Sequence, residues 1–143
     1  MELYDIYVFI EDFENDTIFD FITSYLNGFK QMDDYFEYPQ YKNPTIFETG
    51  SFEKMLGFIL EDANRDFTFY FEKKDNPEYK QGIIKIYPQR AVCLGLSALP
   101  KFEKKIISIL KNKFDTDKII VSYNYPPPSS VMEAKKIIDP NWS

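Results

Sequence analysis

The chain of 143 residues contains no histidine, and this absence excludes much of the chemistry that enzymes commonly use. Histidine is the commonest general base, a frequent metal ligand, and the activator of serine or cysteine in most nucleophile pairs. The sequence has only five glycines and no glycine-rich phosphate-binding loop. Carboxylates are therefore the side chains left to carry catalysis, and no catalytic motif accompanies them.

Cysteine is almost absent too, and Cys93 by itself cannot form an intramolecular disulfide bond, which is typical of a reducing compartment. Cys93 lies in a predicted strand, so we expect a small core residue rather than a nucleophile. The sequence also lacks an apolar run of about 18 residues, the length that spans a membrane. The acidic N-terminus has no basic region of the kind that opens a secretory signal. We expect a cytoplasmic protein with no membrane segment.

The hydrophobic pattern predicts a single α+β domain over residues 1–128 and a C-terminal tail over 129–143. Apolar runs predict strands at 3–10, 45–49, 67–72, 83–87, 91–97 and 118–125. Helical spacing predicts three helices, at 16–28, 52–63 and 100–113. Helices that interrupt a mixed, largely antiparallel sheet predict an architecture loosely like a ferredoxin-type sandwich. Within the tail we expect one or two helical turns and a docked Trp142.

Charge is divided unevenly along the chain. Residues 1–66 hold 15 acidic and 4 basic side chains, a net charge of −11, while residues 67–143 carry +5. The formal net charge of the whole chain is −6, with a pI near 4.7. Either the fold presents two surfaces of opposite charge, or the acids and bases of the two halves pair and cancel.

The stretch 29–44, FKQMDDYFEYPQYKNP, fits neither helical nor strand periodicity and mixes aromatic rings with carboxylates. Tyrosine gives a large contact area at low entropic cost, and carboxylates favour a basic partner. The stretch therefore predicts a partner-binding surface, although its rings could equally cover the sheet edge or the first helix. The candidate contact residues are Asp33, Asp34, Tyr35, Phe36, Glu37, Tyr38 and Tyr41, together with Glu11, Asp12 and Glu14 of the acidic loop 11–16.

A small acidic α+β chain with such a segment resembles the bacterial immunity proteins of polymorphic-toxin and contact-dependent inhibition systems. The likeness rests on the run from Asp33 to Tyr38 and on the acidic loop 11–16, without a family motif. Immunity proteins bind toxin domains tightly, and many of those toxins are basic nucleases. The resemblance implies a non-catalytic binding protein whose partner is a basic toxin domain.

Several other functions stay open. A small enzyme could use carboxylates on a charged substrate, and the chain could be a phage or structural interaction module. Lysines of the helix 100–113, beside Tyr123 and Tyr125, could bind nucleic acid, but the acidic pI opposes this. The loop 11–16 lacks the spacing and turn glycine of an EF-hand, so we expect no metal site and no cofactor. The oligomeric state is not encoded in any pattern of the sequence.

Overall fold

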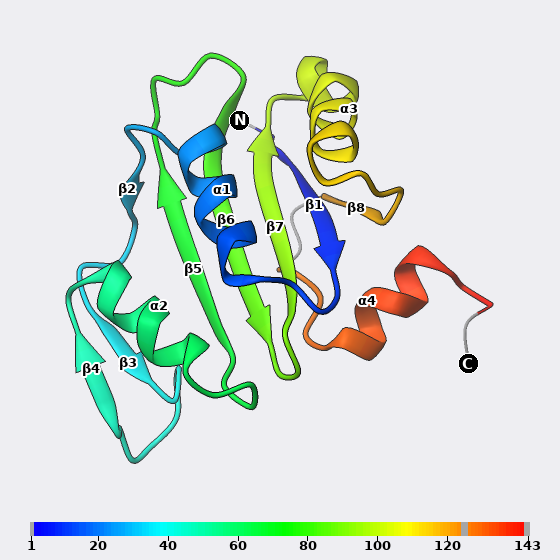
Figure 1. Cartoon of the computed structure of the whole chain (residues 1–143). Helices are drawn as coiled ribbons and strands as arrows, with labels where there is room; N and C mark the ends of the chain where they lie inside the picture. Colours follow the sequence, from blue (N-terminus) through cyan, green and yellow to red (C-terminus); the bar gives the residue numbers. More distant parts are fainter. Residues whose placement is uncertain (1, 124–125, 142–143) are drawn as a thin grey trace.

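A six-stranded sheet forms the centre of the computed structural model, which describes residues 2–123 and 126–141 (Figure 1). All of the described strand pairings are antiparallel. The sheet contains, in spatial order, β2 (Lys30–Gln31), β5 (Phe67–Glu72), β6 (Tyr79–Tyr87), β7 (Ala91–Ala98), β1 (Tyr4–Ile10) and β8 (Ile119–Tyr123). A separate two-stranded hairpin pairs β3 (Phe36–Tyr38) with β4 (Phe47–Thr49).

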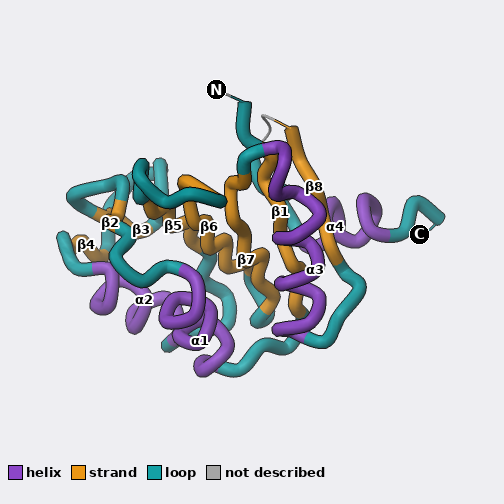
Figure 2. The backbone as a smooth tube through the Cα atoms, turned by 90° about the horizontal axis from the view of Figure 1, so that it is seen from above, coloured by secondary structure: helices purple, strands orange, loops and turns teal. Residues whose placement is uncertain are grey.

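Helices cover both faces of this sheet. They are α1 (Asn15–Tyr25), α2 (Phe52–Leu60), α3 (Glu103–Phe114, after a 3-10 turn at Pro100–Phe102) and α4 (Val131–Ile138). The view along the sheet shows α1, α2 and α3 on one side, with α4 beside β8 (Figure 2). The predicted α+β class and the largely antiparallel sheet are confirmed, and β5, β6 and β7 form an antiparallel meander. The likeness to a ferredoxin-type sandwich stays an expectation.

Strand β1 belongs to both hydrophobic cores because its successive side chains point to opposite faces. Ile6 and Val8 pack in the core beneath α1, α2 and α3, whereas Tyr7 and Phe9 pack in the core beneath α4. All four side chains are at most 1% exposed. A strand in which nearly every residue is apolar is thus buried on both sides along its central part.

The expectation of three helices was wrong, because the tail forms α4 and packs on the second core. Ala134 is fully buried there, and the hydroxyl of Ser130 accepts a hydrogen bond from the backbone N–H of Glu133 at 3.1 Å. The segment before α4 is also fixed, since the Tyr87 hydroxyl donates to the carbonyl oxygen of Pro128 at 2.5 Å. The expected docking of Trp142 concerns a residue outside the described part of the chain.

Several element boundaries differ from the sequence prediction. Strand β6 begins at Tyr79, four residues before the expected start, and β2 and β3 were not anticipated at all. Helix α1 ends at Tyr25, so Gly28, at φ +81°, lies in the following turn rather than at the helix end. Ser51 caps α2, because its hydroxyl accepts a hydrogen bond from the backbone N–H of Lys54 at 3.2 Å.

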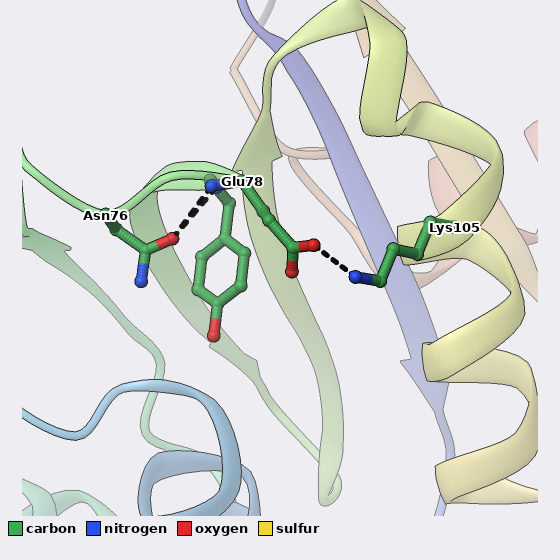
Figure 3. A network of polar contacts seen from close by, with 4 residues as sticks. Asn76, Glu78 and Lys105 are labelled. Carbon is green, nitrogen blue, oxygen red and sulfur yellow. Dashed lines mark hydrogen bonds and ion pairs between the residues drawn. The ribbon is translucent and has the colours of Figure 1, made fainter.

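The β5–β6 turn is tied to helix α3 by a small polar network (Figure 3). The side-chain oxygen of Asn76 accepts hydrogen bonds from the backbone N–H groups of Glu78 and Tyr79, both at 3.1 Å. The Glu78 carboxylate then forms an ion pair with Lys105 of α3. One lysine of the basic helix is therefore used within the fold.

The ring of Tyr7 lies directly over Gly95 of the neighbouring strand β7. A Cβ atom at Gly95 would come within 2.4 Å of the Tyr7 ring, so any residue larger than glycine would clash with the ring in this position. A glycine within a strand often marks a position that another group approaches closely, and at Gly95 that group is the Tyr7 side chain.

We expect Gly95→Ala to lower the free energy of unfolding by about 2 kcal/mol or more, because the added methyl group overpacks the core. Gly57→Ala is the matched control. Gly57 is exposed on α2 with no heavy atom within 4 Å of an added Cβ, so we expect stabilisation of about 0.5–1 kcal/mol. Urea unfolding of both variants measures the difference. Equal effects at the two glycines would contradict the packing of Tyr7 over Gly95.

Candidate functional site

The acidic and aromatic stretch leaves the sheet because β2 is only two residues long. Lys30 and Gln31 pair with the end of β5, and the backbone N–H of Met32 still donates to the carbonyl oxygen of Tyr70 at 2.9 Å. The chain then turns outward and forms the β3–β4 hairpin beside α2. A segment that seemed to have no periodicity therefore contains a short strand, β3, with alternating inward and outward side chains.

The inward side chains of this hairpin belong to the protein core. Phe36 is only 3% exposed and makes edge-to-face contacts with Phe69 and Phe67, at ring-centre distances of 5.4 and 6.0 Å. Tyr38 is half-buried against Phe58 of α2, on which the Phe47 ring of β4 also stacks at 4.4 Å. Each ring could either contact a partner or pack within the fold. Phe36 packs within the fold, and Tyr38 largely does so.

The outward side chains form an exposed acidic and aromatic surface. Tyr35 is 50% exposed and Tyr41 is 88% exposed, and the carboxylates of Asp33, Asp34 and Glu37 are exposed around them. Tyr41 also has a positive φ of 62°, a backbone conformation that costs free energy for a bulky residue. We call Asp33, Asp34, Tyr35, Glu37, Tyr41 and Glu48 the hairpin surface.

Two acids of the hairpin surface face each other directly. The register of the β3–β4 pair places Glu37 opposite Glu48, and both side chains are exposed. Like charges directly opposite each other on neighbouring strands destabilise the pair. Among the described residues, neither glutamate takes part in an ion pair. The hairpin therefore keeps a concentrated negative charge that the rest of the fold does not neutralise.

The loop after β3 is held on the edge of β5 by one glutamine. The side-chain amide of Gln40 donates to the carbonyl oxygen of Thr68 at 2.9 Å and accepts from its backbone N–H at 2.8 Å. These two bonds reproduce the pairing that a neighbouring strand would make. They cover the part of β5 that β2 is too short to reach, and they fix the position of the loop that carries Tyr41.

A pocket of about 230 Å³ opens on the hairpin surface, between the loop and β5. Its lining comprises Asp33, Tyr35, Phe36, Glu37, Gln40, Tyr41 and Phe67. Buried Phe36 and Phe67 contribute apolar surface, whereas the exposed tyrosines and carboxylates contribute polar surface. Asp34 is a neighbour of the pocket in sequence and does not line it.

The phenol groups near this pocket respond to its acids. The pKa of Tyr35 is raised by loss of solvent contact, by a hydrogen bond to Glu48 and by the charge of Glu37. Burial raises the pKa of Tyr70 on β5, and the Tyr41, Asp5 and Asp33 groups add to the shift. Groups from segments far apart in the sequence therefore raise the pKa of these two tyrosines.

The acidic loop 11–16 lies elsewhere. It follows β1, which is separated from β5 by β6 and β7, so it is not part of the hairpin surface. Glu11 forms ion pairs with Lys135 at 3.0 Å and Lys118 at 3.7 Å. Asp12 and Glu14 are exposed in the same loop. The predicted site residues therefore form two separate groups, and at Glu11 the acidic and basic halves of the chain pair with each other.

Three residues of the hairpin region were missed by sequence reasoning. Gln40 and Tyr70 had no distinguishing pattern, because their roles come from contacts with segments about 30 residues away. Glu48 lies in a strand that was predicted, but its partner Glu37 was not assigned to a strand, so the cross-strand pair could not be recognised.

Other chemistry in the described part of the molecule is limited. No group of three or more acids or thiols is placed to hold a metal ion among the residues described. Cys93 is fully buried, and burial raises the pKa of its thiol to about 12. Within residues 2–123 and 126–141, no helix combines the length and the apolar character that a bilayer crossing requires.

The lysines of α3 are exposed, as expected for the solvated side of an amphipathic helix. Lys105 pairs with Glu78, and Lys113 pairs with Asp20 of α1 at 3.0 Å. Tyr123 lies at the end of β8, and Tyr125 falls outside the described residues.

Comparison of the chain with known protein families, with characterised proteins and with solved structures finds no match.

Replacement of single rings separates the packing role from the exposed role. We expect Phe36→Ala to lower the free energy of unfolding by about 3 kcal/mol, because it removes a buried ring from the core. Tyr41→Ala removes an exposed ring, so we expect a melting temperature within a few degrees of the wild type. Differential scanning calorimetry of both variants tests the assignment, which fails if Tyr41→Ala destabilises the protein as much as Phe36→Ala.

Cys93 is expected to react slowly with thiol reagents in the folded protein. The reactive thiolate is scarce at neutral pH when the thiol pKa is about 12, and the buried sulfur is inaccessible. Labelling followed by absorbance, with and without denaturant, measures this protection. We expect rapid labelling only after unfolding, and rapid labelling of the native protein would refute the core position of Cys93.

Proposed function

We propose that this chain is a non-catalytic protein-binding module whose hairpin surface binds a basic protein partner. The proposal rests above all on the Glu37–Glu48 pair, two exposed carboxylates opposite each other that form no ion pair in the described part of the chain. A basic partner would relieve this repulsion on binding, because an opposite charge at the interface replaces the unfavourable like-charge contact. The fold itself gains nothing from the arrangement.

The exposed rings support the same proposal. Tyr35 and Tyr41 present aromatic surface beside the acids, and tyrosine is enriched among residues that dominate binding energy. The hairpin behind them is anchored by Phe36 in the core and by Phe47 on Phe58. An anchored surface loses little conformational freedom when a partner binds, which favours affinity.

We further propose that the partner is a toxin domain and that the chain acts as an immunity-type inhibitor in the cytoplasm. The resemblance to immunity proteins and the acidic hairpin surface support this assignment, since many such toxins are basic nucleases. The alternatives of a carboxylate enzyme and of a phage or structural module have no specific observation in their favour. The pocket of the hairpin surface, at about 230 Å³, is smaller than the roughly 300–1,000 Å³ typical of small-molecule sites.

The proposal is tested by co-expression with the products of the neighbouring genes, beginning with any that encodes a basic, toxin-like protein. We expect the wild-type chain to restore growth and to bind that protein in calorimetry. Tyr35→Ala should weaken binding roughly 30-fold if that ring is a central contact. The double variant Asp33→Asn/Asp34→Asn should slow association and reduce its salt dependence, with less effect on dissociation.

A matched control is the double variant Asp75→Asn/Asp117→Asn, which removes the same charge from exposed positions outside the hairpin surface. We expect this control to retain wild-type association. The proposal fails if the control and the surface variant slow association equally, or if neither growth rescue nor binding is observed. Melting temperatures measured alongside show whether lost affinity reflects lost folding.

A further inference from the structure

The pocket of the hairpin surface has the size of a site for one side chain. Its volume of about 230 Å³ lies below the range of sites that enclose a cofactor or drug-sized ligand. It is bounded by apolar surface from Phe36 and Phe67, which are 3% and 2% exposed. Such a site can take a long side chain whose apolar stem contacts the buried rings and whose polar end stays near the opening.

The aromatic part of the lining favours a flat cation. Tyr35 and Tyr41 both line the pocket and are exposed, so their rings offer aromatic surface to a ligand. A guanidinium group stacks on aromatic faces and is more weakly hydrated than an ammonium group. The loop that carries Tyr41 is held in place before any ligand binds, because the neighbouring Gln40 forms two hydrogen bonds with Thr68.

The charged residues of the lining also favour a guanidinium group. Asp33 and Glu37 both line the pocket, and neither takes part in an ion pair among the described residues. A planar guanidinium offers five donors that can meet two separate carboxylates at once. A metal ion fits less well, because the described part of the chain has no group of three acids placed to hold one.

We propose that this pocket receives an arginine side chain of the partner, with the guanidinium against Tyr35 and Tyr41 and its charge met by Asp33 and Glu37. This assignment rests on the proposed function and deepens it, because it names the chemical group that the hairpin surface recognises. Lysine is the weaker ligand here, since its ammonium is a compact charge without a stacking plane.

The test is an NMR titration of the full-length, ¹⁵N-labelled protein with N-acetyl-arginine amide. We expect saturable shifts at residues 33–41 and 67–70, where the pocket lies. The neutral citrulline analogue has the same shape and should bind about tenfold more weakly, because it lacks the charge that the carboxylates meet. Equal binding of the citrulline analogue, or shifts spread over the whole surface, would overturn the assignment.

Variants distinguish the pocket from a general negative field. Asp33→Asn should weaken arginine-amide binding about threefold, whereas Asp34→Asn removes the same charge next to the pocket and should have a clearly smaller effect. Tyr41→Ala should weaken binding about threefold, and Tyr41→Phe should retain it. Equal losses at Asp33 and Asp34 would show diffuse attraction rather than a pocket, and equal affinity for N-acetyl-lysine amide would refute the preference for guanidinium.

The titration and the co-expression experiment fail independently. Binding of a basic partner through Tyr35, without any response to arginine amide, would overturn the arginine pocket and leave the proposed function intact. Saturable arginine binding with no basic protein partner would support the pocket and refute the proposed function. The amide spectra of all variants report directly whether each variant is folded.

Discussion

Burial of strand β1 on both faces is the constraint on which the rest of the structure depends. Its side chains alternate between the core beneath α1, α2 and α3 and the core beneath α4, as do those of β6 and β7. β1 lies between β7 and β8, which brings the start of the chain into contact with its second half. The glycine at position 95 is required in the same place, since it leaves room for the ring of Tyr7.

Because β1 lies between β7 and β8, acidic side chains of the first half of the chain come close to basic side chains of the second half. The acidic first half and the basic second half share one sheet, and acids such as Glu11 and Asp20 pair with lysines of the second half. Exposed pairs of this kind contribute little to stability, but they remove the local excess of charge. The hairpin surface lies at the far edge of the sheet, beyond β5, where no such lysine pairs with its acids in the described structure.

The hairpin surface has features that folding alone does not explain. Glu37 faces Glu48, and Tyr41 occupies a positive-φ conformation with its ring almost fully exposed. Each feature costs free energy in the isolated protein. A cation at an interface would offset the repulsion between the glutamates, and contacts to the Tyr41 ring would add binding energy against the backbone cost. The stable part of the hairpin, Phe36 and Phe47, contributes the anchoring that such an arrangement needs.

The sequence by itself determined those elements whose signal is local. The alternating phenylalanines of β5, the apolar face of α2 with its Ser51 cap, and the burial of Cys93 follow from period, capping and composition. It also identified the stretch that carries the hairpin surface, because carboxylates and tyrosines together are unusual in a solvated loop. These inferences depend only on residues within a few positions of one another.

The tertiary structure decided everything that depends on a partner far along the chain. Phe36 and Tyr35 are adjacent aromatic residues, yet one is buried and the other exposed, because successive side chains point to opposite sides and Phe36 is the one that packs on Phe67 and Phe69 of β5. The docking of α4 and the position of Gln40 on Thr68 likewise arise from contacts between distant segments. A strand pairing has no local signature, and a shift of one residue would reverse every side chain, so only the folded chain determines which acids and rings form a surface.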